Sequence, residues 1–402
     1  MSDLYCPLPP RDQDIFRFRR SYGVNLGPTF IQGPSLNQTT APNELEALTS
    51  SIETNGLEAT ASTWQSHWLS ALPNNELLRL RDTCHCNTIQ LALGFLTLGP
   101  LFSQGTPFEG APAQVYTRCW SAIKHLIERC HAYGIGILLN FDLTANEVDL
   151  RSSPERLALA RDCIAFIAQE VTFHALHGVV GLRVSTSSTE QSRPDPPTLR
   201  DWYKEIRMIV SAIDESLPLY ISDESPAGTE LFPDCETPLH HHHHHQLVQA
   251  DSGQPEPAGT TTLPPAPGHL LLSRDEVQTK AQQARIERPQ LLREALARLE
   301  GEEAEEEVGE KGERAKEKYC HSAAGRQSFV HGWDLGYSDA LRFFDAAVEG
   351  LVPQRAGADK IGEVELWARR RARDVARLEE NHQAWELGLR RGIADFNRFV
   401  GI

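Results

Sequence analysis

Polar side chains stand near the ends of two apolar runs in this chain. Asn25 lies near the end of the first run. Asn140 and Asp142 end a later run, and Asn146 comes soon after it. Amide and carboxylate groups at such positions are able to line a cleft and hydrogen-bond a polar ligand, and they are equally able to close local turns. From sequence alone we favour the turn role. Neither run ends in the pair of acids that acid and base catalysis of hydrolysis would need.

The apolar runs themselves are predicted strands of a parallel sheet. They are short and continuous with little alternation, which is typical of strands whose two faces are both buried. Five good candidates occupy residues 22–26, 87–93, 136–142, 179–184 and 218–222. A weaker sixth candidate lies at residues 231–240.

Amphipathic helices are predicted between the later strands. The first carries apolar residues at helical spacing over 123–130 and stops at Gly134. The second opens with Ser153 as the cap and Pro154 as the first helical residue, and the third spans residues 202–213. This alternation implies parallel strands with right-handed crossovers, so the predicted class is α/β, either a (β/α)8 barrel or an open doubly wound sheet.

Composition limits the possible classes of protein. The 402 residues are 40% hydrophobic and carry a formal net charge of -16, so the chain can build one barrel or two modest domains. The negative charge argues against nucleic acid or an anionic membrane as a partner. No segment approaches ~20 consecutive apolar residues, and the first twenty residues lack the apolar core of a secretory signal. We therefore expect a cytoplasmic protein with reduced thiols.

Cysteine and histidine do not form a convincing metal site in the sequence. The eight cysteines are scattered, and Cys84-His85-Cys86 lacks the second ligand pair of a structural zinc site. Residues 240–245 are all histidine and would chelate transition metals if exposed, but an internal homopolymer is more typical of a repeat expansion or an engineered remnant. We expect neither a metal nor a cofactor.

The organisation of the chain changes after residue 223. Residues 254–267 are rich in proline and are predicted to be a linker. Beyond it the chain is predicted to be helical, with a solvated acidic run at 300–307. The segment WDLG at 333–336 is echoed by WELG at 385–388, which predicts two helices that each anchor a tryptophan on a common surface.

Several segments, taken in order, resemble the successive strands of fungal glycoside hydrolases of family 5, the glucan 1,3-β-glucosidase-like group. These segments are RSYGVNLG at 20–27, HW at 67–68, NTIQLALG at 87–94, YG at 133–134 and LYISD at 219–223. The tail segments at 332–344 and 385–388 are similar to the helical extension of fungal members. We therefore divide the chain into a partial barrel at 1–240, a linker at 241–268 and a helical region at 269–402. With five or six strands the (β/α)8 barrel would be incomplete.

The resemblance implies a retaining glycosidase with two glutamates about 5 Å apart, one acid/base and one nucleophile. In relatives the acid/base comes after the fourth strand as Asn-Glu, and here Thr186 and Ser187 occupy that place. A serine hydroxyl is far too weak an acid to protonate a glycosidic oxygen. Glu190 lies three residues further on and would reach a cleft only if the loop refolded.

The second carboxylate is expected on strand seven within a Gly-Glu-aromatic-Ser segment. No such segment occurs in the sequence, and the chain passes through the linker into residues 270–276, which resemble the segment after the finished barrel in relatives. Strands seven and eight are therefore predicted to be missing, together with the nucleophile. Glu224 and Glu313 are formal alternatives, but their charged or proline-rich surroundings predict exposed side chains.

Further positions depart from the family pattern. Gln90 stands where an arginine is expected, Asn140 and Asp142 replace an Asp-x-His segment, and Thr29 replaces an aromatic residue. Two functions remain open. One is a hydrolase of β-linked glucan by kinship, with poor activity or an incomplete gene; the other is a non-catalytic relative that binds β-glucan, a related glycan or a protein. Loss of both carboxylates favours the second.

Overall fold

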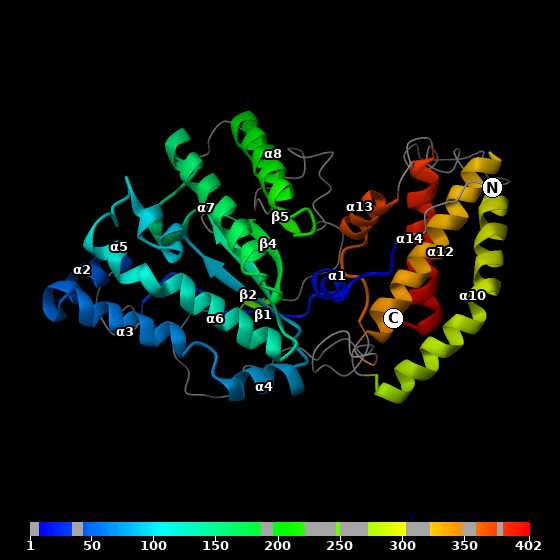
Figure 1. Ribbon diagram of the computed structural model, residues 1–402, viewed down its shortest axis with the longest axis horizontal. Helices are drawn as coiled ribbons and strands as arrows, with labels where there is room; N and C mark the ends of the chain where they lie inside the picture. Colours follow the sequence, from blue (N-terminus) through cyan, green and yellow to red (C-terminus); the bar gives the residue numbers. More distant parts are fainter. Residues whose placement is uncertain are drawn as a thin grey trace. The chain divides into compact units, whose positions relative to one another are not determined.

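The computed structural model divides the chain into two compact units (Figure 1). The sheet unit is Ser21–Pro265, and the helical unit combines Met1–Arg20 with Ala266–Ile402. The structure describes residues 8–33, 43–185, 196–221, 247–249, 272–302, 322–346, 348, 359–375 and 381–402. The domain boundaries predicted at residues 240 and 268 fall outside these ranges, so they stay predictions.

A parallel sheet in the order β5-β4-β3-β2-β1-β6 forms the centre of the sheet unit. Its strands are β1 (Gly23–Asn25), β2 (Thr88–Leu93), β3 (Gly136–Asp142), β4 (Val179–Ser185), β5 (Leu219–Ile221) and β6 (Leu247–Gln249). The first five confirm the five good strand candidates. β6 was not predicted, because three residues after a histidine run carry too little pattern, and the weaker candidate at 231–240 lies outside the described residues.

Helices begin and end where the sequence places its caps. α6 (Cys119–Ala132) precedes Gly134, which has a φ of +73°, and α7 (Pro154–Phe173) begins after Ser153, whose hydroxyl accepts a hydrogen bond from the amide of Arg156. Together with α8 (Pro196–Ile213), these helices confirm the three predictions. The other helices are α2 (Glu44–Asn55), α3 (Leu57–Leu69), α4 (Asn74–Asp82) and α5 (Ala111–Val115), with 3-10 turns η1 (Phe95–Leu98), η2 (Pro100–Ser103), η3 (Tyr116–Arg118) and η4 (Ala145–Glu147).

One face of the sheet is apolar and packs on the helices. Alternate strand residues point to this face and join side chains of α3, α6, α7 and α8 in one core; they include Ile89, Leu91, Leu93, Ile137, Leu139, Phe141, Leu182 and Val184. Burying each such side chain is worth about 1.5–3 kcal/mol. The intervening residues lie on the opposite face, which is therefore free to carry polar groups.

The helical unit is built on a close pair of helices. α12 (Ala323–Asp345) and α14 (His382–Val400) meet through glycines within the repeated segments and directly before the first of them. A Cβ on Gly332 would lie 2.0 Å from the carbonyl oxygen of Trp385, and one on Gly388 would lie 2.1 Å from that of Phe329. Trp333 and Trp385 are both buried as expected, but glycine is what permits this approach of the two backbones.

Among its described residues this unit also contains three further helices, α1 (Asp12–Phe18), α10 (Arg274–Glu302) and α13 (Val364–Asp374). α1 is tied to the segment before α13, because the amide of Gly362 donates to the carbonyl of Phe18 at 2.9 Å and the rings of Phe18 and Trp367 lie 5.2 Å apart. The N-terminal segment is therefore part of the helical unit. Within the described ranges, no helix has both the length and the apolar composition needed to cross a bilayer.

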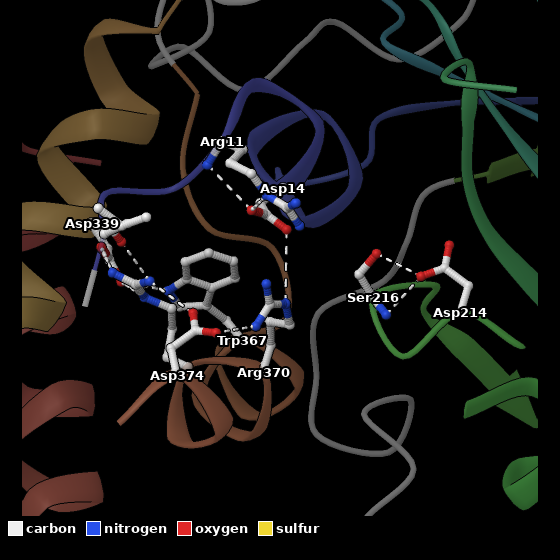
Figure 2. Close-up of polar contacts among 10 residues, drawn as sticks. Arg11, Asp14, Asp214, Ser216, Asp339, Trp367, Arg370 and Asp374 are labelled. Atoms are coloured by element: carbon white, nitrogen blue, oxygen red, sulfur yellow. Dashed lines mark hydrogen bonds and ion pairs between the residues drawn. The ribbon is translucent and has the colours of Figure 1, made fainter. Parts of the chain in front are cut away.

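A buried ion pair joins α12 to α13 (Figure 2). Asp339 accepts hydrogen bonds from Arg371 Nε at 2.8 Å, Arg371 Nη2 at 2.9 Å and Trp367 Nε1 at 3.0 Å. Arg371 also donates to the carbonyl oxygen of Leu8 and to Asp374. Burial raises the pKa of Asp339 to about 6, against the attraction of Arg371. The cluster thus fixes α13 and the N-terminal segment to α12.

Candidate functional site

Polar residues gather on the face of the sheet opposite the helices. The register pairs Asn25 of β1 with Gln90 of β2, and Asn140 of β3 with Arg183 of β4. Because side chains alternate along a strand, Asp142 shares this face with Asn140. Arg183 Nη1 donates to Gln90 Oε1 at 3.2 Å across the intervening strand β3. The strands are parallel, so these residues lie toward the carboxyl ends that meet at one edge. We call them the polar face.

Two of the predicted site residues close local turns. Asp142 Oδ1 accepts hydrogen bonds from the amide of Thr144 at 2.8 Å and from its hydroxyl at 2.7 Å. Asn25 Oδ1 accepts from the amide of Gly27 at 3.0 Å. Both arrangements are Asx turns, in which a side chain satisfies the backbone two residues on. Asn25 and Asp142 therefore make the contacts of the turn role that the sequence favours, and their part in binding a ligand stays a prediction.

The other two predicted residues, Asn140 and Asn146, each have a side-chain oxygen that accepts no hydrogen bond from the described residues. Asn140 is 8% exposed, and its Oδ1 has no hydrogen-bond partner among the described residues. Asn146 donates from Nδ2 to the carbonyl of Ile31 at 2.8 Å, while its own Oδ1 likewise has no described partner. Asn146 has a φ of +57°, a conformation that costs energy and is common at functional sites. A ligand hydroxyl would satisfy either oxygen.

The loop after β1 is held by a carboxylate that the sequence did not single out. Glu44 Oε2 accepts from the amide of Gly33 at 2.9 Å, and Glu44 Oε1 accepts from Trp64 Nε1 at 3.0 Å and from the Tyr116 hydroxyl at 2.8 Å. The same hydroxyl lies 3.0 Å from the carbonyl of Ile31. Glu44 is 4% exposed, and burial raises its pKa against these hydrogen bonds.

Arg183 was also missed by sequence reasoning, although a signal for it exists. The sequence has Gln90 where the family pattern has an arginine. The structure brings a guanidinium to the side chain of Gln90 from the far side of β3. In the strand VVGLRVS at 179–185, the lone charged residue stands at an alternate position from apolar neighbours, which is the pattern of a residue facing away from the core.

The predicted catalytic positions lie outside the described residues. Ser187, Glu190, Glu224 and Glu313 all fall there, as does the histidine run at 240–245. Their assignments therefore stay predictions. Within the described ranges, no group of three or more His, Cys, Asp or Glu side chains is arranged to hold a metal ion.

Comparison with known proteins gives two matches. Residues 300–400 match the family model of the glucan 1,3-beta-glucosidase 3 C-terminal domain. Glucan 1,3-beta-glucosidase 3 of Schizosaccharomyces pombe (strain 972 / ATCC 24843) is 23% identical over 229 residues, which cover 52% of this chain and 47% of that protein. The chain is a relative of fungal glucan 1,3-beta-glucosidases. It spans about half the length of the curated relative that it matches.

The match to the family model and the polar face lie in different parts of the chain. The described helices α12, α13 and α14 fall inside the segment that matches the C-terminal domain of the glucosidase. Asn25, Asn140, Asp142 and Asn146 lie in the sheet unit instead. The family match therefore concerns residues 300–400 of the helical unit, while the candidate site rests on the geometry of the sheet.

Proposed function

We propose that the sheet unit binds β-glucan on its polar face and that its glycosidase activity is impaired. The observation that carries this proposal is the chemistry of the polar face. It offers amides and a guanidinium, which hydrogen-bond sugar hydroxyls well, whereas Asp142 already uses one carboxylate oxygen to close a turn. The described part of this face holds no second carboxylate beside it. Its described residues supply binding groups, and the predicted catalytic positions lie outside them.

We further propose that the sheet is an incomplete (β/α)8-like barrel of the family 5 type. Consecutive strands β1 to β5 are neighbours, and β6 pairs with the free side of β1, as the last strand of a barrel does. The polar face would then line the interior, with the carboxyl ends of the strands at the binding edge. Kinship to a named glucosidase supports this assignment.

Impaired hydrolysis is expected from the chemistry of retention. Two carboxylates about 5 Å apart must act as nucleophile and as acid/base. Ser187 occupies the expected acid/base position, and the sequence lacks the strand-seven segment that carries the nucleophile. The second candidate function is hydrolysis of β-glucan, favoured by the activity in the name of the S. pombe relative. It would require Glu190 and Glu224 to supply the pair.

Binding and turnover of one purified sample separate the two functions. We expect a soluble 1,3-β-glucan oligosaccharide to bind in calorimetry, while an aryl β-glucoside shows neither turnover nor a burst. The aryl substrate is the sharper probe, because its leaving group needs little protonation and a surviving nucleophile would still release it. Ser187→Glu alone should restore nothing. A burst in the parent chain, or turnover in that variant, would establish the hydrolase instead, and absence of glucan binding would overturn the proposed function.

A further inference from the structure

Glu44 accepts three hydrogen bonds from three separate segments of the sheet unit. Gly33 belongs to the loop after β1, Trp64 to α3 and Tyr116 to η3. Their donors reach the two carboxylate oxygens at 2.8–3.0 Å. The convergence of N–H and O–H donors calls for a group that only accepts, and an ionised carboxylate is the side chain with that property.

The contacts continue from Glu44 to Asn146, which lies where the carboxyl ends of the strands meet beside the polar face; we call this edge of the sheet the polar edge. The Tyr116 hydroxyl also lies 3.0 Å from the carbonyl of Ile31, which accepts from Asn146 Nδ2 at 2.8 Å. Asn146 in turn lies against the end of β2, because a Cβ on Gly94 would lie 3.1 Å from Asn146 Oδ1. A buried carboxylate is thus connected, through one tyrosine and one carbonyl, to an asparagine at the edge of the sheet whose acceptor has no partner among the described residues.

The groups around Glu44 are neutral. Tyr116 and Cys119 are the titratable side chains that interact with it electrostatically, and burial together with the Glu44 charge raises the pKa of each. His67 contacts the same loop at the backbone of Thr29, and burial lowers the pKa of its ring. The donors that oppose the effect of burial on Glu44 are an amide, an indole and a phenol. Its negative charge is therefore balanced by dipoles.

We propose that ionised Glu44 is a positioning residue for glucan binding: it fixes the loop at residues 26–33 and, through Tyr116 and Ile31, holds Asn146 at the polar edge. The proposal rests on the proposed function. Neutralising Glu44 turns one oxygen into a donor, so at least one of the three partners then faces a donor and must move. Because Ile31 of this loop accepts the hydrogen bond of Asn146 Nδ2, movement of the loop removes the fixed geometry of the ligand site, and the affinity for glucan falls.

Stability and affinity should respond to acid in opposite directions. The pKa of Glu44 is raised above its ordinary value, so the folded protein binds this proton more tightly than the unfolded chain does. The contribution of Glu44 to stability therefore increases as the pH falls through the raised pKa. Glucan affinity should decrease over the same range. A side chain with a purely structural role would change both in the same direction.

The test compares Glu44→Gln with Glu46→Gln in the full chain, because Glu46 is exposed on the same helix. We expect Glu44→Gln to bind a 1,3-β-glucan oligosaccharide about tenfold more weakly at neutral pH, with a flat pH profile, and Glu46→Gln to match the parent. Gly33→Ala, whose Cβ would lie 2.1 Å from Trp64 Nε1, should repeat the loss. Equal affinity in Glu44→Gln and the parent would overturn the proposal.

Hydrogen exchange distinguishes failure of the positioning role of Glu44 from failure of the proposed glucan binding. We expect amides of residues 26–33 to exchange faster in Glu44→Gln than in the parent or in Glu46→Gln. Unchanged exchange in that loop overturns the positioning role whatever the ligand. A parent chain that binds no glucan overturns the proposed function, and with it glucan as the ligand of this site.

Discussion

Both units of the molecule contain a buried acidic side chain with a raised pKa, and they satisfy it differently. In the sheet unit Glu44 is surrounded by neutral donors, whereas in the helical unit Asp339 contacts the guanidinium of Arg371. Burial raises the pKa of both, in spite of these partners. Even the full opposite charge of Arg371 therefore does not recover the hydration that the buried carboxylate of Asp339 loses.

The consequences of removal should nevertheless differ. Taking away Asp339 leaves a second charge, Arg371, which is buried with only 3% of its side chain exposed. Taking away the charge of Glu44 leaves only dipoles. The helical unit should therefore be the more fragile of the two toward loss of its acid.

The largest expected effect is that of Asp339→Ala. The substitution leaves the buried guanidinium of Arg371 without its principal partner. We therefore expect the free energy of unfolding of the helical unit to fall by about 3–5 kcal/mol. Denaturant unfolding measures this loss. The matched control is Asp374→Ala, which removes the half-buried second partner of Arg371 and should cost no more than about 1 kcal/mol. Equal losses in the two variants would contradict the comparison.

The free energy of unfolding of the helical unit should depend on pH through the titration of Asp339. Its pKa rises from 3.8 to about 6, so the folded state binds the proton more tightly than the unfolded state. The associated stability is fully present below 3.8 and is lost as the pH rises through about 6, with a slope of at most about 1.4 kcal/mol per pH unit. Unfolding at a series of pH values tests this slope. Asp339→Asn should remove it, and an unchanged profile would show that another group titrates there.

The smallest effect on stability is expected for Glu44→Gln. The variant loses one acceptor but also relieves the burial of a charge, so the two changes offset one another to within about 1 kcal/mol. Thermal or denaturant unfolding of the sheet unit provides the measurement. A loss as large as that of Asp339→Ala would mean that removing an acid costs as much beside neutral donors as beside a guanidinium. That result would contradict the expected difference between the two units.

Sequence reasoning located the features that local patterns determine. Five strands and three helices were predicted because the strands are continuous apolar runs, the helices carry apolar residues at helical spacing, and caps are explicit, as at Ser153 and Gly134. The turn roles of Asn25 and Asp142 depend on neighbours two residues away, so they too were readable. β6 has three residues and no such pattern.

The remainder of the site depends on contacts between distant residues. Glu44 and Tyr116 are 72 positions apart, and Gln90 and Arg183 are 93 positions apart. A single sequence carries no local sign of such pairs, because each residue alone has the pattern of an ordinary helix start, core aromatic or strand residue. Their joint role emerges only from the order in which the sheet brings the strands together.

Glucan binding on the polar face is tested by measuring the affinity of Asn140→Ala for a 1,3-β-glucan oligosaccharide in calorimetry. Asn140 holds a buried acceptor without a partner in the described part of the chain, so its loss should weaken binding about tenfold while leaving unfolding nearly unchanged. Asn55→Ala, on the exposed surface of α2, is the control and should bind like the parent. Equal affinity of Asn140→Ala and the parent would contradict the assignment of glucan to this face.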